Sequence, residues 1–127
     1  MDERSAIPRL PDAELAVMQA LWALGEYPAH TGDIAARLGK DWKAPTLLKL
    51  LSRLEERGFV AGSKEGRANV YTPLVRREDY LASESRSFLE RLHGGSLSSL
   101  MAALYPETKL SKEDVAALER ILEKGGK

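Results

Sequence analysis

Three amphipathic segments, each closed by a glycine, occupy the first half of the chain, and two β-type segments follow them directly. The amphipathic segments span residues 11–25, 31–39 and 45–58, and the first and third open on proline. Proline is favoured at the first helical positions and glycine just after the last one. These boundaries predict three helices, with Thr31 as the cap of the second.

The third segment has two unlike faces. At 100° per residue, Leu47, Leu51 and Leu54 share one face, with Leu50 at its edge. The opposite side is polar and basic, and it carries Thr46, Lys49, Ser52 and Arg53. Two helices joined by a short connection, the second with such a face, are typical of a helix-turn-helix whose second helix enters the major groove of DNA. An ordinary helical hairpin with a solvated face is the alternative.

The segment after the third helix favours the first interpretation. Residues 59–64 and 67–74 are predicted to be two strands around Glu65-Gly66, where glycine can supply the positive φ of a tight turn. Lys64 and Arg67 flank the tip of this hairpin. Three helices followed by a basic-tipped hairpin predict a winged helix-turn-helix.

The C-terminal part is predicted to be helical. Helices are expected over residues 76–93, 96–104 and from 111 onward, separated by Gly94-Gly95 and by Pro106, and Ser111 with Asp114 resembles a capping box. The fold class is therefore mainly α with a small β-hairpin. We expect a DNA-binding domain over residues 8–75 and a helical dimerisation region over residues 76–125.

The apolar stripes of these later helices exceed what a winged domain of this size can cover, and a symmetric second copy is the simplest cover. Folding back on the same chain is the alternative. The residues predicted to form a homodimer interface are Tyr80, Leu81, Phe88, Leu89, Leu92, Leu97, Leu100, Met101, Leu104, Val115, Leu118, Ile121 and Leu122.

Charge is distributed unevenly along a chain whose net charge is zero. Residues 40–77 contain nine basic and four acidic side chains, so the remainder is acidic. A basic middle suits a protein that meets phosphate with one surface. We expect Trp22, Trp42 and Tyr71 to be packing residues, although Trp42 could instead brace the third helix or touch the DNA backbone.

Other classes of protein lack support in the sequence. The chain has no cysteine and only two histidines, neither with metal-ligand spacing, and no Gly-x-Ser-x-Gly or phosphate-binding glycine loop occurs. We expect no catalytic site, no metal and no cofactor. There is no long apolar run and no signal sequence, so we expect a cytoplasmic protein without membrane insertion.

Several motifs together resemble the penicillinase repressor family of the BlaI, MecI and CopY type, over residues 10–122. They are Leu10-Pro11-Asp12-Ala13-Glu14, Met18 with Leu21-Trp22, Thr46-Leu47 with Leu51, Arg53-Leu54 and Gly58, Gly66-Arg67-Ala68 with Tyr71-Thr72-Pro73-Leu74, and Gly94-Gly95-Ser96 with Leu100. The resemblance implies a homodimeric repressor that binds a palindromic double-stranded DNA operator. It also implies that a sensor or a protease relieves the repression in response to a signal. This chain departs from the proteolysed members, because Ala103-Leu104 stands where they have an Asn-Phe bond, and from the copper-responsive members, because it lacks cysteine.

The residues expected to contact DNA fall into two groups. Thr46, Lys49 and Arg53 can face the groove together, with Ser52 at the edge, and Arg53 either bonds guanine or holds a phosphate. Lys43, Lys64 and Arg67 are expected on phosphates. The alternatives are a winged-helix module that binds protein, which needs an exposed apolar patch on the third helix, and a regulator of the MarR type that senses a small ligand.

Overall fold

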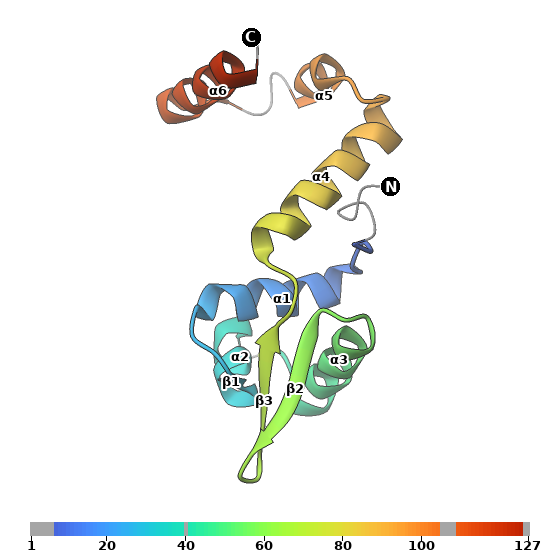
Figure 1. The fold of residues 1–127 in the computed structure, drawn as a ribbon, viewed down its shortest axis with the longest axis vertical. Helices are drawn as coiled ribbons and strands as arrows, with labels where there is room; N and C mark the ends of the chain where they lie inside the picture. The colour runs from blue at the N-terminus through green and yellow to red at the C-terminus, as the bar shows by residue number, and fades with distance from the viewer. Residues whose placement is uncertain (1–6, 40, 105–108, 126–127) are drawn as a thin grey trace. The chain divides into compact units, whose positions relative to one another are not determined.

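The computed structural model describes residues 7–39, 41–104 and 109–125 (Figure 1). In these ranges the chain is mainly helical with one small antiparallel sheet, which confirms the predicted fold class. The elements in chain order are α1 (Asp12–Leu24), β1 (Ala29–His30), α2 (Thr31–Leu38), α3 (Ala44–Glu56), β2 (Val60–Glu65), β3 (Ala68–Pro73), α4 (Arg77–His93), α5 (Leu97–Leu104) and α6 (Lys112–Gly125).

The sheet has the strand order β1-β3-β2, and β3 pairs with both neighbours in antiparallel fashion. The hairpin of β2 and β3 was predicted, but β1 was not. Its two residues pair with Tyr71 and Val70 of β3. Two residues are too short for any alternation to be visible, so only the pairing with β3 reveals this strand. β1 matters because it holds the start of α2 against the hairpin.

The hairpin turn lies one residue later than predicted. Glu65 pairs with Ala68, so the loop consists of Gly66 and Arg67 rather than Glu65 and Gly66. Gly66 has a φ of +65°, which is the conformation that favours glycine at the first loop position. Arg67 is therefore at the tip itself. Figure 1 shows this tip extending beyond the ends of α2 and α3.

The leucine face of α3 is packed inside the first part of the chain. Leu47, Leu51 and Leu54 are fully buried, and Leu50 is 7% exposed, so Leu50 belongs to the core rather than to its edge. They pack with Met18 and other apolar residues of α1. This packing orients α3 and leaves its other side to solvent.

Two predicted helix starts have different outcomes. Thr31 is the first residue of α2 and not its cap, because His30 occupies the cap position and its amide donates to the Asp33 carboxylate at 3.2 Å. The hydroxyl of Thr31 donates instead to the carbonyl oxygen of Asn69 on β3 at 3.4 Å. Ser111 does form the predicted reciprocal cap of α6: its Oγ accepts from the amide of Asp114 at 3.0 Å, and its amide donates to the Asp114 carboxylate at 3.3 Å. Pro106, predicted to end α5, lies outside the described residues.

Tyr80 fixes the first turn of α4 to the winged region. The ring is 3% exposed and lies 5.9 Å, centroid to centroid, from both Trp22 and Phe59. Its hydroxyl accepts a hydrogen bond from the amide of Leu10 at 2.9 Å. The indole of Trp22 donates to the carbonyl oxygen of Val75 at 2.9 Å, just before α4. A side chain so enclosed has no surface for a second copy, so Tyr80 is a core residue rather than part of a dimer face.

A buried ion pair joins α1 to the end of α3. The carboxylate of Glu14 is 2% exposed and receives two hydrogen bonds from Arg57, at 2.6 Å from Nε and 3.4 Å from Nη2. Arg57 immediately follows α3, and Gly58 then adopts a φ of +84° before β2 begins. The pair therefore fixes the position at which α3 ends and the hairpin starts.

Internal contacts divide the chain into a unit up to Ser87 and a unit from Phe88 onward. In the second unit, Ser96 caps α5 by accepting the amide of Ser99 at 3.0 Å, and Gly94 and Gly95 both have positive φ. No large apolar side chain of its described residues is fully buried. Within the described ranges, no helix has the length and apolar character needed to cross a membrane.

Replacing Glu14 with Ala should lower the free energy of unfolding by about 2 to 3 kcal/mol. Breaking a fully buried ion pair costs about 3 to 5 kcal/mol because one charge is left without a partner, and the 38% exposure of Arg57 reduces that cost. Urea unfolding followed by circular dichroism measures the change. The matched control is Asp79→Ala, which breaks the exposed pair with Arg76 and should leave stability unchanged. Equal effects of the two variants would contradict this role of Glu14.

Candidate nucleic-acid interface

The solvent side of α3 carries the polar residues predicted from the helical pattern. Every one of them is exposed, as is the residue that caps the helix, and together they are Lys43, Thr46, Lys49, Ser52 and Arg53. Lys43 precedes the helix in an extended conformation, and Pro45 is in its first turn. The buried leucines on the other side force these polar residues outward.

The hairpin adds two further cations. Lys64 is the fifth residue of β2 and Arg67 is the second residue of the loop, and both are exposed. α3 and β2 pack against each other. We call Lys43, Lys49, Arg53, Lys64 and Arg67 the basic surface.

The cations of the basic surface lack carboxylate partners among the described residues, whereas three other arginines of the first unit have them. Arg57 is paired with Glu14, Arg9 with Glu84 and Arg76 with Asp79. Unpaired cations on one surface produce a local positive potential, even though the net charge of the chain is zero. Such a surface favours a polyanion.

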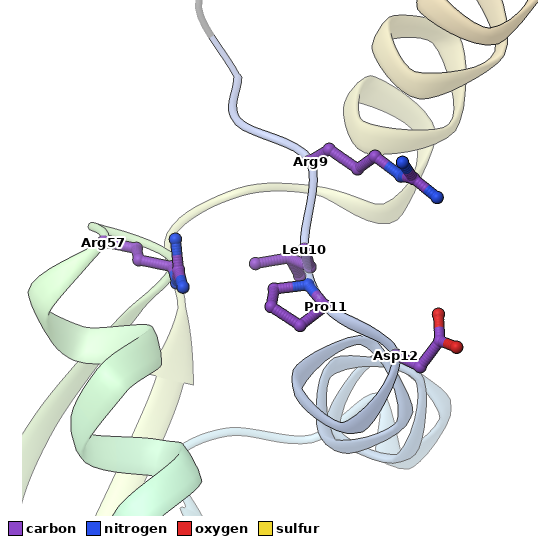
Figure 2. Close-up of a pocket in the computed structure, with 5 residues that line it drawn as sticks. All are labelled: Arg9, Leu10, Pro11, Asp12 and Arg57. Carbon is purple, nitrogen blue, oxygen red and sulfur yellow. The ribbon is translucent and has the colours of Figure 1, made fainter.

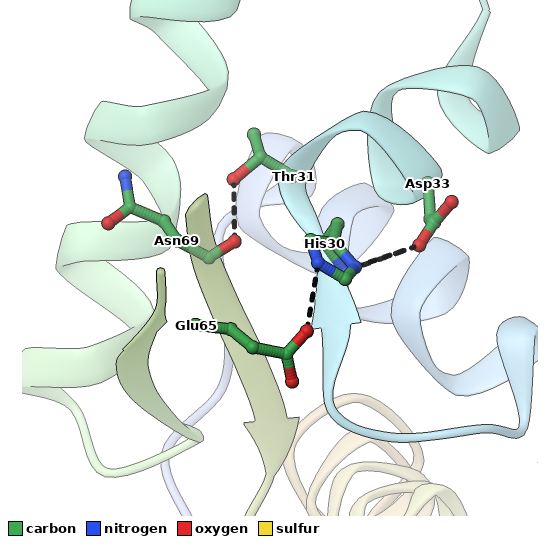
Figure 3. A network of polar contacts seen from close by, with 5 residues as sticks. All are labelled: His30, Thr31, Asp33, Glu65 and Asn69. Atoms are coloured by element: carbon green, nitrogen blue, oxygen red, sulfur yellow. Dashed lines mark hydrogen bonds and ion pairs between the residues drawn. The ribbon is translucent and has the colours of Figure 1, made fainter. Parts of the chain in front are cut away.

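A polar network links the loop end of the hairpin to the start of α2 (Figure 3). The ring of His30 lies between two carboxylates, with Nε2 3.2 Å from Glu65 and Nδ1 3.7 Å from Asp33. The hydroxyl of Thr31 donates to the backbone of Asn69 nearby. Since Glu65 directly precedes the loop, these contacts help to fix the position of Lys64 and Arg67.

The other edge of the hairpin comes unusually close to α3 at Gly62. A Cβ added there would lie 3.1 Å from both Oε1 of Glu55 and Cε1 of Tyr71. Burial, with a smaller effect of the Glu55 charge, raises the pKa of the Tyr71 phenol above its usual value. Next to this contact is a hollow of about 230 Å³, which Ser63, Lys64 and Asn69 also line. A side chain at residue 62 would therefore displace the Glu55 carboxylate or the Tyr71 ring slightly.

Trp42 is half-buried and packs against the core cluster. This packing corresponds to the alternative in which it braces α3. Trp22 and Tyr71 also pack against or within the core, as expected.

A second hollow of about 440 Å³ lies away from the basic surface (Figure 2). Arg9 and Arg57 lie on opposite sides of the Leu10-Pro11 segment there, and Asp12 is at its edge. Each arginine already has a carboxylate partner. The hollow thus offers little net positive charge to an anionic ligand.

Most of the residues predicted to face a second copy have accessible apolar surface. Leu89, Leu100, Met101 and Leu118 are half-buried. Only Tyr80 of this set is fully buried. The remainder are exposed, and they are Leu81, Phe88, Leu92, Leu97, Leu104, Val115, Ile121 and Leu122.

Sequence reasoning missed Glu14, His30 and Gly62 as residues that position this interface. A buried acid within an amphipathic helix and a histidine before a helix give no periodic signal, and both gain their roles from partners far along the chain. Within the described residues, no three His, Cys, Asp or Glu side chains gather as metal ligands.

Comparison with known proteins identifies the family. The family model described as "Penicillinase repressor" matches residues 10–124. The chain belongs to the penicillinase repressor family. It is 36% identical to the penicillinase repressor of Bacillus licheniformis, over 92% of this chain and 91% of that protein. It is 27% identical to the methicillin resistance regulatory protein MecI of Staphylococcus aureus, over 91% of this chain and 94% of that protein.

One solved structure of the family is also similar. It is the solution structure of the Bacillus licheniformis BlaI monomeric form in complex with the blaP half-operator, 36% identical, with a TM-score of 0.48. The match covers 58% of this chain and 90% of that one. The resemblance to the penicillinase repressor family predicted from the sequence motifs is thus confirmed by the family match.

Replacing both Lys64 and Arg67 with Ala should weaken binding to every DNA sequence and flatten its dependence on salt. Each phosphate contact contributes about 0.9 to the slope of log affinity against log salt, so the slope should fall by about 1.8 for each protomer bound. Fluorescence anisotropy with duplex DNA between 50 and 200 mM salt would be a suitable measurement. Lys109→Ala with Lys112→Ala removes the same charge from another part of the chain and should keep the slope. An unchanged slope in the hairpin variant would remove the hairpin from the contacts.

Proposed function

We propose that this chain is a DNA-binding transcriptional repressor that acts as a homodimer on a palindromic operator. The single observation that carries the proposal is the basic surface: on α3 and the hairpin of a chain with zero net charge, exposed cations have no carboxylate partner among the residues that the structure describes. Membership of a family named for a repressor supports it.

In this function α3 lies in the major groove. Thr46, Lys49 and Arg53 face base edges, with Ser52 at the side of the contact. An arginine can bond guanine through two hydrogen bonds, and a threonine methyl can touch a thymine methyl. Arg53 holds a phosphate in operators that lack a suitably placed guanine.

The phosphate contacts come from the ends of the interface. Lys43 precedes the first turn of α3, and Lys64 and Arg67 are at the hairpin tip. Contacts of this kind fix register and orientation on the duplex without reading sequence. The network of His30 with Glu65 supports this role, because it limits movement of the tip relative to α2.

We further propose a division of labour, with residues 8–75 binding DNA and residues 76–125 forming the dimer. Exposed leucine and isoleucine side chains on α4, α5 and α6 support a second copy as their cover: Leu92, Leu97 and Ile121 are each more than half exposed. Two-fold symmetry of the protein would match the two halves of a palindrome.

A sensor or a protease that relieves repression is the remaining proposed partner. Ala103 and Leu104 are exposed within α5, where the family resemblance places an Asn-Phe bond in the proteolysed members. Because a repressor works where the chromosome is, we propose the cytoplasm as its location.

The purified full chain should protect a palindromic site upstream of its own gene at nanomolar concentrations. Specific protein–DNA affinities are about 10⁻⁸ to 10⁻¹¹ M, and the variant Lys49→Ala with Arg53→Ala should lose this protection. Nuclease footprinting measures both. The variant should melt like the wild type, since both side chains are exposed. Absence of protection by the wild type at micromolar concentration and low salt would overturn the proposed function.

Replacing Leu92 and Ile121 with Asp should convert the protein to a monomer. Sedimentation equilibrium should give two copies of the 14.0 kDa chain for the wild type and one for the variant, because charge cannot be desolvated in an apolar interface. Leu74→Asp is the matched control, since Leu74 is 59% exposed but precedes α4. A wild-type monomer at micromolar concentration would refute the dimer.

A further inference from the structure

Leu48 is an exposed leucine on the helix that carries the basic surface. Its side chain is 38% exposed, whereas Leu47, Leu50, Leu51 and Leu54 of the same helix are buried. The core of the first unit is complete without it. Leu48 therefore leaves apolar area in water beside Ser52, which the proposed function places at the side of the DNA contact.

The position of Leu48 on α3 is defined by its helical neighbours. Pro45 and Ser52, at i−3 and i+4, form one exposed stripe with it, and Lys49 is beside it. Glu55 is two turns further along the same edge, and its carboxylate meets the hairpin at Gly62. Leu48 thus lies on the edge of α3 that faces the hairpin.

The surroundings of Leu48 fit a single small apolar partner. Its exposed neighbours on the helix are Ala44, Pro45, Lys49 and Ser52, so the apolar area around it is bordered by polar side chains. In the major groove only thymine presents an apolar group, its 5-methyl, and apolar side chains contact it. A leucine cannot donate or accept a hydrogen bond, so it has nothing to offer the other bases.

We propose that Leu48 is a specificity-determining residue that contacts the 5-methyl group of one thymine in each operator half-site. This inference rests on the proposed function, and it adds an apolar contact to the polar residues Thr46, Lys49 and Arg53. Leu48 selects thymine because contact with the methyl removes apolar surface of both groups from water. Its place between Lys49 and the hairpin puts the selected base on the hairpin side of the base that Lys49 reaches.

The test uses the full-length protein and the operator fragment defined by footprinting. Each thymine of a half-site is replaced in turn by deoxyuridine, which removes only the methyl group. The wild type should lose about fourfold in affinity at the position that Leu48 contacts in each half-site, the effect of one methyl group leaving a contact; a thymine touched by Thr46 would respond at a separate position, and Leu48→Ala should keep that response. Leu48→Ala should bind the unmodified operator about fourfold or more weakly and should be indifferent to deoxyuridine at that same position.

Two controls separate this contact from other effects. Leu74→Ala removes an equally large apolar side chain that is 59% exposed elsewhere in the first unit, and it should respond to deoxyuridine as the wild type does. Leu48→Ala should retain the wild-type melting temperature and salt slope, because neither the core nor a phosphate contact is altered. Loss of affinity by Leu48→Ala without loss of the deoxyuridine response would overturn the inference, and so would unchanged affinity.

The result also distinguishes the inference from the function on which it rests. If the wild type protects no operator, the proposed function fails. If it protects one and Leu48→Ala keeps every deoxyuridine effect, only the role of Leu48 fails.

Discussion

The ion pair of Glu14 with Arg57 is the contact on which the geometry of the first unit depends. It is a desolvated carboxylate held by two hydrogen bonds, and it joins the first turn of α1 to the residue that ends α3. From that point the chain turns at Gly58, and the amide of Phe59 donates to the carbonyl oxygen of Leu54 at 2.9 Å. The hairpin closes on the same place, since Leu74 donates to Phe59 at 2.8 Å. One buried charge thus lies where α3 stops and where both strands of the hairpin begin.

A second set of contacts fixes the far end of the hairpin. β1 pairs with β3, and the ring of His30 reaches Glu65 next to the loop (Figure 3). Root and tip are therefore attached to different helices, α3 and α2. Arg57 is a paired cation that holds two elements together, while the cations of the basic surface project from the helix and hairpin without a carboxylate partner in the described part of the chain.

The sequence predicts the parts of this structure that repeat along the chain. The leucine period of residues 47–54 predicted α3, its buried face and its polar face, and glycine at 66 predicted the tight turn. Contacts between residues far apart in the chain leave no periodic pattern in the sequence. Glu14 is an acid in an apolar stripe until Arg57 is seen beside it, and β1 is too short to alternate. Tyr80 fits the apolar pattern of α4, so periodicity alone assigned it to the same face as Leu81.

Tyr80 also shows why residue type and spacing cannot divide this chain into functions. α4 is a single helix, and Tyr80 in its first turn packs in the core against Trp22 and Phe59. The residue after Tyr80, Leu81, is 42% exposed. Helical neighbours point about 100° apart, so one residue can belong to the winged core while the next faces solvent. Tyr80 and Ser83 are therefore on the buried face of α4, while Leu81 lies on its accessible face. A contact made by a second copy on that accessible face would act on a helix whose other face already packs in the first unit.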